Sequence, residues 1–216
     1  MGKEFGAVSA ALLCMVCGPA AATTFAVQIV DQDGKAAPNA VVTLTPEGRS
    51  MPAPGTRSDA EKVIDQRNET FIPLVTVLPR NGHIVFANHD KTKHQVYSFS
   101  AIKQFEITLV QGENSPPFLF DKAGIATVGC NIHDHMIAYV VVTDSPWTAV
   151  AGADGRAEIA DVPAGNYDVQ VWHPQLPPGS NPPTDRIVLS GDTTAYTAKL
   201  KLLSPPPMGH MHMAHY

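Results

Sequence analysis

The chain has 216 residues, of which 44% are hydrophobic and 16% are charged, a balance that argues against a disordered protein. Its net charge of −5 argues against a nucleic-acid-binding surface. Three cysteines are too few for a disulfide-stapled small fold, and the 19 Pro and 16 Gly favour many turns and short strands over long helices.

Residues 1–22 have the layout of a secretory signal peptide. Lys3 precedes an uncharged apolar stretch over residues 5–17, and Ala20-Ala21-Ala22 supplies small residues for cleavage. The apolar stretch is too short to span a membrane, and no other stretch is long enough. We therefore expect cleavage after about Ala22 and export to the periplasm, with a retained membrane anchor as the alternative. The mature chain then keeps one cysteine, Cys130, which cannot form an internal disulfide and so points to a metal-binding or reactive role.

Short runs of β-branched and aromatic residues, most of them separated by Gly or Pro turns, predict strands along the rest of the chain. Turns are expected at residues 31–34 and at Asp154-Gly155, and no long amphipathic helix is evident. An all-β fold, a sandwich or barrel, is therefore predicted. The predicted strands are 25–30, 41–44, 71–78, 83–87, 94–99, 105–109, 124–129, 137–143, 157–159, 167–172, 187–189 and 195–203.

Two distant segments share the features of one known β-sandwich. VDQDGKAAPNAVVTL at residues 30–44 and ADGRAEIADVPAGNYDVQV at 153–171 together resemble the transthyretin-like, carboxypeptidase-regulatory type of domain. The resemblance implies that residues 23–58 and 145–203 form one split sandwich. Residues 59–144 are then inserted into it or packed beside it, which an exposed loop tolerates. Two unrelated groups of strands are the alternative.

The inserted segment carries the residues with metal-binding chemistry. The sequence VGCNIHDHMI at residues 128–137 places Cys130, His133 and Met136 in one loop between two predicted strands, and His94 lies upstream. Two imidazoles, a thiolate and a thioether form the ligand set of a blue-copper site. The sulfur ligands favour Cu(I), and imidazole accommodates both oxidation states.

Because of the residues in this loop, residues 59–144 resemble a cupredoxin of the amicyanin and plastocyanin type. The C-x2-H-x2-M spacing is that of amicyanins, and CNIHDHM with the later VWHP is similar to periplasmic cupredoxin-containing proteins labelled methylamine-utilisation proteins. The resemblance implies one type 1 copper, with His94, Cys130 and His133 as equatorial ligands and Met136 as the axial ligand. It also implies an all-β fold in which a Greek-key cupredoxin sandwich is inserted in or packed beside a second small β-sandwich.

Other polar side chains remain as alternatives or as structural groups. His135 is a possible alternative ligand or a surface group that tunes the site. Many cupredoxins have an Asn directly after the upstream histidine ligand, and its side chain supports the site by a hydrogen bond. This chain has Gln95 at that position, so the sequence does not establish this hydrogen bond. We expect His89 in a turn, and His173 in a structural role.

The C-terminus, residues 204–216, begins with a Pro-rich spacer and continues with Met and His. These residue types bind Cu(I) and Cu(II) respectively, which makes the tail a weak candidate for capturing copper. A terminus without a role is the alternative. The candidate tail ligands are His210, Met211, His212, Met213 and His215.

The expected function is periplasmic one-electron transfer through Cu(I) and Cu(II), not catalysis. The partner would be a redox protein such as a c-type cytochrome or a dehydrogenase, docking near Ile132 and Ile137, with no nucleic acid and no membrane span. Copper storage or delivery by the site and the tail is the main alternative. Two weaker alternatives are an enzyme with a Cys130–His133 nucleophile pair and a zinc site that also uses His94 and His135.

Overall fold

A computed structural model describes residues 22–48, 51, 60–191 and 193–204, which form sixteen β-strands and no α-helix. The predicted signal sequence up to residue 21 and the predicted tail ligands lie outside the described residues. No helix among the described residues is long and apolar enough to cross a membrane. The strands are β1 (Ala22–Val30), β2 (Val41–Pro46), β3 (Glu61–Gln66), β4 (Phe71–Ile72), β5 (Val75–Pro79), β6 (Gly82–Asn88), β7 (His94–Ser100), β8 (Lys103–Leu109), β9 (Phe118–Phe120), β10 (Gly124–Cys130), β11 (Ile137–Thr143), β12 (Thr148–Val150), β13 (Arg156–Pro163), β14 (Gly165–Trp172), β15 (Thr184–Leu189) and β16 (Thr193–Lys199).

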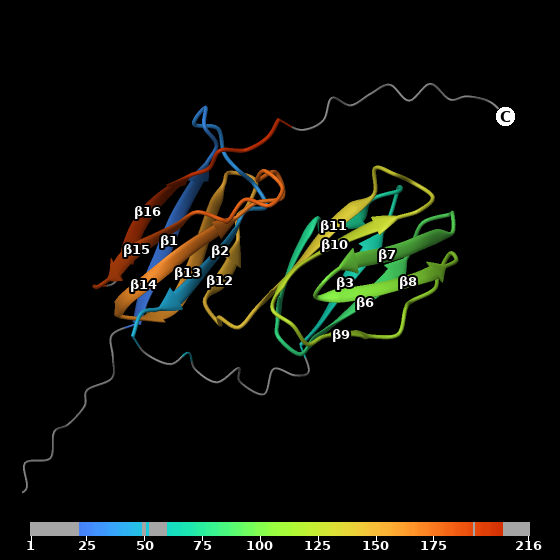
Figure 1. Cartoon of the computed structure of the whole chain (residues 1–216), viewed down its shortest axis with the longest axis horizontal. Helices are drawn as coiled ribbons and strands as arrows, with labels where there is room; N and C mark the ends of the chain where they lie inside the picture. The colour runs from blue at the N-terminus through green and yellow to red at the C-terminus, as the bar shows by residue number, and fades with distance from the viewer. Residues whose placement is uncertain (1–21, 49–50, 52–59, 192, 205–216) are drawn as a thin grey trace, which may run out of the picture.

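One sandwich combines the beginning and the end of the described chain (Figure 1). Its two sheets have the strand orders β13-β1-β16 and β12-β2-β14-β15. Strand β1 alternates as its sequence predicts, because Phe25, Val27 and Ile29 are buried while the residues between them are half-buried. Tyr167 lies fully buried in the same core, and its hydroxyl donates a hydrogen bond of 2.8 Å to the Pro163 carbonyl. The core of this first sandwich also contains Leu44, Val169, Val171 and Leu200.

The second sandwich consists of the intervening strands β3 to β11. Its sheets have the orders β5-β11-β10-β7-β8 and β4-β3-β6-β9. Strand β10 pairs antiparallel with both β11 and β7, and in the latter pairing Cys130 is opposite Val96. The core between these sheets includes Ile64, Phe86, Val96, Phe120, Val140 and Cys130.

The predicted all-β class, one sandwich packed beside or inserted in another, is confirmed, and the strand boundaries differ in places. The predicted strand 71–78 is two strands, because Pro73 has no N–H to donate to a sheet ladder. Strand β3 was not predicted: its burial alternates only at Ile64 and Gln66, and its first three residues are exposed. The two short strands β9 and β12 also lacked a sequence signal, since each spans three residues.

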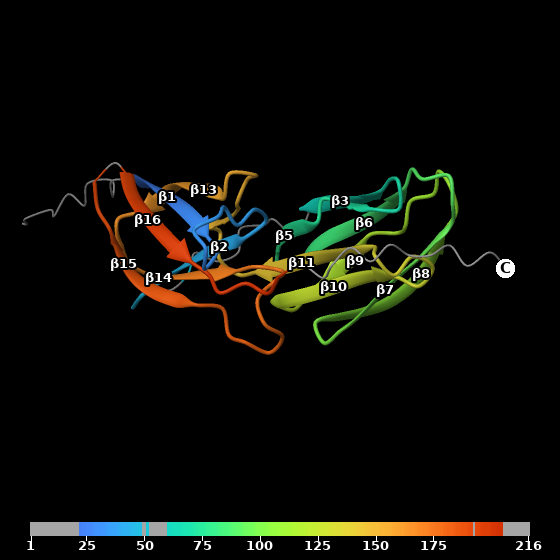
Figure 2. The same ribbon diagram turned by 90° about the horizontal axis from the view of Figure 1, so that it is seen from above.

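The two sandwiches touch through a small apolar cluster. Figure 2 shows β5 and β11 facing β2 and β14, and the buried valines of this contact come from three of those strands: Val41, Val75 and Val141. The rings of Tyr139 and Trp172 meet edge to face across it, with centroids 5.4 Å apart. Because aromatic pairs in this geometry attract beyond simple burial, this pair helps to fix the contact.

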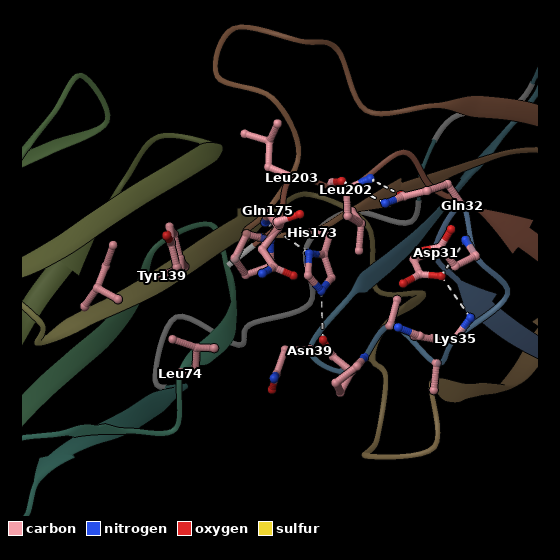
Figure 3. A pocket seen from close by; sticks show the side chains of 17 residues that line it. Asp31, Gln32, Lys35, Asn39, Leu74, Tyr139, His173, Gln175, Leu202 and Leu203 are labelled. Atoms are coloured by element: carbon pink, nitrogen blue, oxygen red, sulfur yellow. Dashed lines mark hydrogen bonds between the residues drawn. The ribbon is translucent and has the colours of Figure 1, made fainter. Parts of the chain in front are cut away.

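A cavity of about 600 Å³ lies beside this contact, between the two sandwiches (Figure 3). Leu74 and Tyr139 line it from the second sandwich, and His173 and Gln175 line it from the first. His173 is buried, its Nε2–H donates to the Pro38 carbonyl at 3.0 Å, and its Nδ1 accepts from the Gln175 N–H at 3.0 Å. Both ring nitrogens therefore form hydrogen bonds with backbone groups, which is the structural role expected of this histidine.

Candidate metal centre

Three side chains predicted as metal ligands converge on one point. Nδ1 of His94 lies 3.7 Å from Sγ of Cys130, Nδ1 of His133 lies 4.0 Å from the same sulfur, and the two nitrogens are 3.2 Å apart. The three ligand atoms all lie within 4.8 Å of one another, and no other such group of His, Cys, Asp or Glu occurs in the described part of the chain. Two of the three residues, His94 and Cys130, are buried, while the side chain of His133 is 18% exposed.

The sheet register explains why these residues meet. His94 begins β7 and Cys130 ends β10, where it pairs with Val96. Since alternate residues of a strand share one face, His94 and Val96 both point into the sandwich, as Cys130 does. The loop after Cys130 returns His133 to the same place. The Asn131 N–H donates to the Gln95 carbonyl, and the Met136 N–H donates to the His133 carbonyl, each at 3.0 Å.

The two remaining candidates from the loop lie in different environments. Met136 is 2% exposed and belongs to the same buried cluster as Cys130. His135 lies outside the converging group: its side chain is 54% exposed, and its Nε2 is 3.6 Å from a carboxylate oxygen of Glu69. The loop therefore buries its thioether and exposes its second histidine.

Two carboxylates that sequence reasoning missed face the outer nitrogens of the converging histidines. Oδ2 of Asp90 lies 3.2 Å from Nε2 of His94, and Oε1 of Glu69 lies 3.5 Å from Nε2 of His133. The hydrogen bond that Asp90 accepts from the backbone N–H of Glu69 is the main cause that lowers the pKa of Asp90 below its usual value. Burial acts in the opposite direction. Asp90 precedes His94 by four residues, a spacing that could have been noticed. Glu69 has no local signal, because its position depends on the folding of β3 and β4.

Other side chains named from the sequence do not join the site. The Gln95 amide donates to Glu106 on the neighbouring strand, so the hydrogen bond that the cupredoxin resemblance left open does not come from this side chain. His89 is largely exposed and pairs with Asp65 at 2.6 Å.

The donor set fits a transition metal. A buried thiol next to two imidazoles offers one sulfur and two nitrogens, the ligand types that copper and zinc prefer. The carboxylates at the outer ring nitrogens are the usual supports of metal-binding histidines, because they favour the tautomer whose inner nitrogen carries the free lone pair. The arrangement thus has both the donors and the supporting groups of a metal site.

The solved structures to which this chain is similar include copper proteins. No protein-family model and no curated protein matches the sequence. A purple cupredoxin from Nitrosopumilus maritimus is 22% identical, with a TM-score of 0.35, over 39% of this chain and 100% of that one. Amicyanin from Paracoccus versutus is 16% identical, with a TM-score of 0.36, over 47% of this chain and 98% of that one. A copper-containing nitrite reductase from Thermus scotoductus is 22% identical, with a TM-score of 0.35, over 38% of this chain and 22% of that one.

Proposed function

We propose that the protein is a one-electron carrier that holds a single type 1 copper with His94, Cys130 and His133, and with Met136 as the fourth ligand. One observation carries the proposal: two imidazole nitrogens and one thiol sulfur converge within 4.8 Å in the interior of a β-sandwich. Copper, when bound by such donors, exchanges one electron between Cu(I) and Cu(II).

The fold of the protein keeps these donor atoms in fixed positions. Cys130 and His94 lie on paired strands, so the sheet ladder fixes their separation. Asp90 accepts the Nε2 proton of His94, which leaves Nδ1 as the free donor. A site that keeps its geometry needs little rearrangement when an electron enters or leaves.

The partly exposed imidazole of His133 supports a route for the electron to the surface. Ile132 lies in the loop, Ile137 directly follows it, and the two residues are 45% and 40% exposed. Small apolar patches of this kind suit the transient interfaces of redox partners. The proposed partner is a redox protein such as a c-type cytochrome or a dehydrogenase, met in the periplasm after removal of residues 1–22.

The role of the first sandwich is part of the same proposal. We divide the chain into a transthyretin-like domain of residues 23–58 and 145–203 and a cupredoxin domain of residues 59–144. The two sheets that hold β1, β2 and β12 to β16 support this division.

A nucleophilic enzyme is disfavoured by burial. Cys130 and His133 do have a carboxylate behind them in Glu69, as a catalytic triad would. Cys130, however, is only 3% exposed, so a substrate carbonyl would not reach its sulfur. We therefore assign no catalytic residue.

Copper storage or delivery stays the alternative function, favoured by the Met and His of residues 208–215.

The test is to load the purified protein with Cu(II) and record its visible and EPR spectra. The proposal predicts an intense thiolate-to-copper band that Cys130→Ser abolishes, and rapid electron exchange with a c-type cytochrome. A colourless complex with ordinary tetragonal EPR parameters would contradict it. Preference for Zn²⁺ with no visible band would instead indicate the zinc site, and copper transfer that depends on residues 205–216 would indicate delivery.

A further inference from the structure

A strained turn lies directly over the candidate metal centre. Strands β3 and β4 are joined by the turn at residues 67–70, in which Arg67 and Thr70 exchange backbone hydrogen bonds of 3.0 and 3.1 Å around the central residues Asn68 and Glu69. Both central residues have positive φ, 49° at Asn68 and 52° at Glu69. This backbone accepts Asn readily but favours Gly in the second position, where the chain has Glu. Unfavourable conformations of this kind cluster at functional sites, which makes this turn a candidate for a role there.

At that position Glu69 makes three contacts with the surroundings of the site. Its N–H donates to Oδ2 of Asp90 at 2.6 Å, its Oε1 lies 3.5 Å from Nε2 of His133, and its Oε2 lies 3.6 Å from Nε2 of His135. The same Oδ2 of Asp90 lies 3.2 Å from Nε2 of His94. One turn residue is therefore connected to both imidazoles that point Nδ1 towards Cys130.

We propose that Glu69 is a positioning residue for both of these imidazoles. Its carboxylate attracts the single proton of neutral His133 to Nε2, so that the lone pair of Nδ1 faces the thiol. Its N–H holds Asp90 where that carboxylate does the same for His94. The inference rests on the proposed metal-binding function for its effect on copper, whereas its effect on the tautomers concerns the metal-free protein alone.

The simpler explanation is that Glu69 is a solvated turn residue. Its side chain is 45% exposed, and the contacts to His133 and His135 are at ion-pair distances rather than short hydrogen bonds. On that explanation Glu69→Gly only relieves backbone strain. The protein would become more stable, and the histidines would not change.

The chain offers a matched control for the strain. Asn68→Gly relaxes the adjacent residue of the same turn but leaves the carboxylate in place. We expect Glu69→Gly and Asn68→Gly to unfold at the same or a higher temperature than the wild type when metal-free. Glu69→Gln keeps the size of the side chain and an acceptor oxygen without the charge, and it serves as the conservative variant should Glu69→Gly fail to fold.

The first readout is the tautomer of His133 in the metal-free full-length protein, measured by long-range ¹H–¹⁵N NMR correlation. His94 is the internal reference and should not change, because every variant keeps the backbone N–H of residue 69 that donates to Asp90. The proposal expects the Nε2–H form of His133 in the wild type and in Asn68→Gly. It expects a mixture of the two tautomers in Glu69→Gly and a partial return of the Nε2–H form in Glu69→Gln. An unchanged His133 tautomer in Glu69→Gly would overturn the proposal.

The second readout is Cu(I) affinity, measured by competition with a chromophoric chelator. Removing a group that supports a ligand typically lowers metal affinity 10–100-fold, so we expect a loss of that size in Glu69→Gly and none in Asn68→Gly. Equal affinity in the two variants would refute the positioning role. A wild type that binds no copper would refute the proposed function instead, and the NMR comparison would still decide the role of Glu69.

Discussion

His94 and His133 point the same ring nitrogen at each other, with 3.2 Å between their Nδ1 atoms. Two neutral imidazoles that both carry their proton on Nε2 place two lone pairs together here, a repulsion that the carboxylates at the outer nitrogens offset in the metal-free protein and that a cation between the rings would remove. The sulfur of Cys130 is close to both nitrogens, and Asp90 and Glu69 occupy the opposite sides of the rings. The site is therefore prepared for a positive charge at its centre.

Replacing Met136 and His135 separately tests which of the two side chains is the fourth ligand of the proposed copper site. Met136→Leu conserves volume at a 2% exposed position, so the metal-free protein should lose less than about 1.5 kcal/mol of stability. The thiolate-to-copper band should remain, because Cys130 is intact, while the EPR parameters should shift with loss of the thioether. His135→Ala is the control and should change neither spectrum. The opposite result, with a shift only in His135→Ala, would make the exposed histidine the ligand.

Replacing Gly155 should destabilise the first sandwich strongly. This residue has a φ of 74°, and an added Cβ would lie 2.5 Å from the carbonyl oxygen of Ile29, which is backbone and cannot move aside. We expect Gly155→Ala to cost about 3 kcal/mol or more in the free energy of unfolding, measured with a chemical denaturant. Gly34→Ala has a similar φ of 80° and open space around it, so it should cost only about 1 kcal/mol. Equal losses in the two variants would show that the contact with Ile29 is unimportant.

The sequence was informative where the signal is local. Cys130 and His133 lie in one short loop between two strands, so their types and spacing were enough to place them together. His94 was identified differently, as the upstream histidine that completes the ligand set and that the cupredoxin resemblance implies. The turn at Gly155 was expected from its Asp-Gly pair, and the structure confirms it with a hydrogen bond from the Gly155 N–H to the Gly152 carbonyl.

The supporting carboxylates could not be predicted in the same way. Glu69 is a charged residue in a polar turn, a pattern that usually indicates a solvated loop. Its place above His133 follows from the parallel pairing of β3 with β6, two segments that are separated in the chain by the short strands β4 and β5 and their connections. Long-range pairing of this kind leaves no periodic signal in β3, where the first three residues are exposed.

Lowering the pH should weaken the fold through His173. Burial lowers the pKa of this histidine below its usual value of 6.5, against a smaller opposing effect of its hydrogen bond to the Pro38 carbonyl. The unfolded chain therefore binds the proton more readily than the folded one. The stabilising contribution is complete above about pH 6.5 and is lost as the pH falls through the lowered pKa.

Denaturant midpoints of the wild type and of His173→Gln at pH 7.5 and pH 5 check this expectation. Glutamine retains a donor for the Pro38 carbonyl but does not titrate, so the variant should be less stable at pH 7.5 and should lose less stability on acidification. Other groups titrate equally in both proteins, and the difference between them isolates His173. An identical loss in both proteins would exclude this histidine as a source of the pH dependence.

Removing the ring of Trp172 should loosen the contact between the sandwiches. This ring meets Tyr139 edge to face beside the buried residues Val41, Val75 and Val141. Trp172→Ala should lower the free energy of unfolding by about 2 kcal/mol, less than for a fully buried Trp because the residue is only half-buried. Tyr139→Phe keeps the ring pair and should stay within about 0.5 kcal/mol of the wild type. Small-angle scattering should then show a broader distribution of distances between the two sandwiches for Trp172→Ala alone, and an unchanged profile would mean that the valines hold the contact without the aromatic pair.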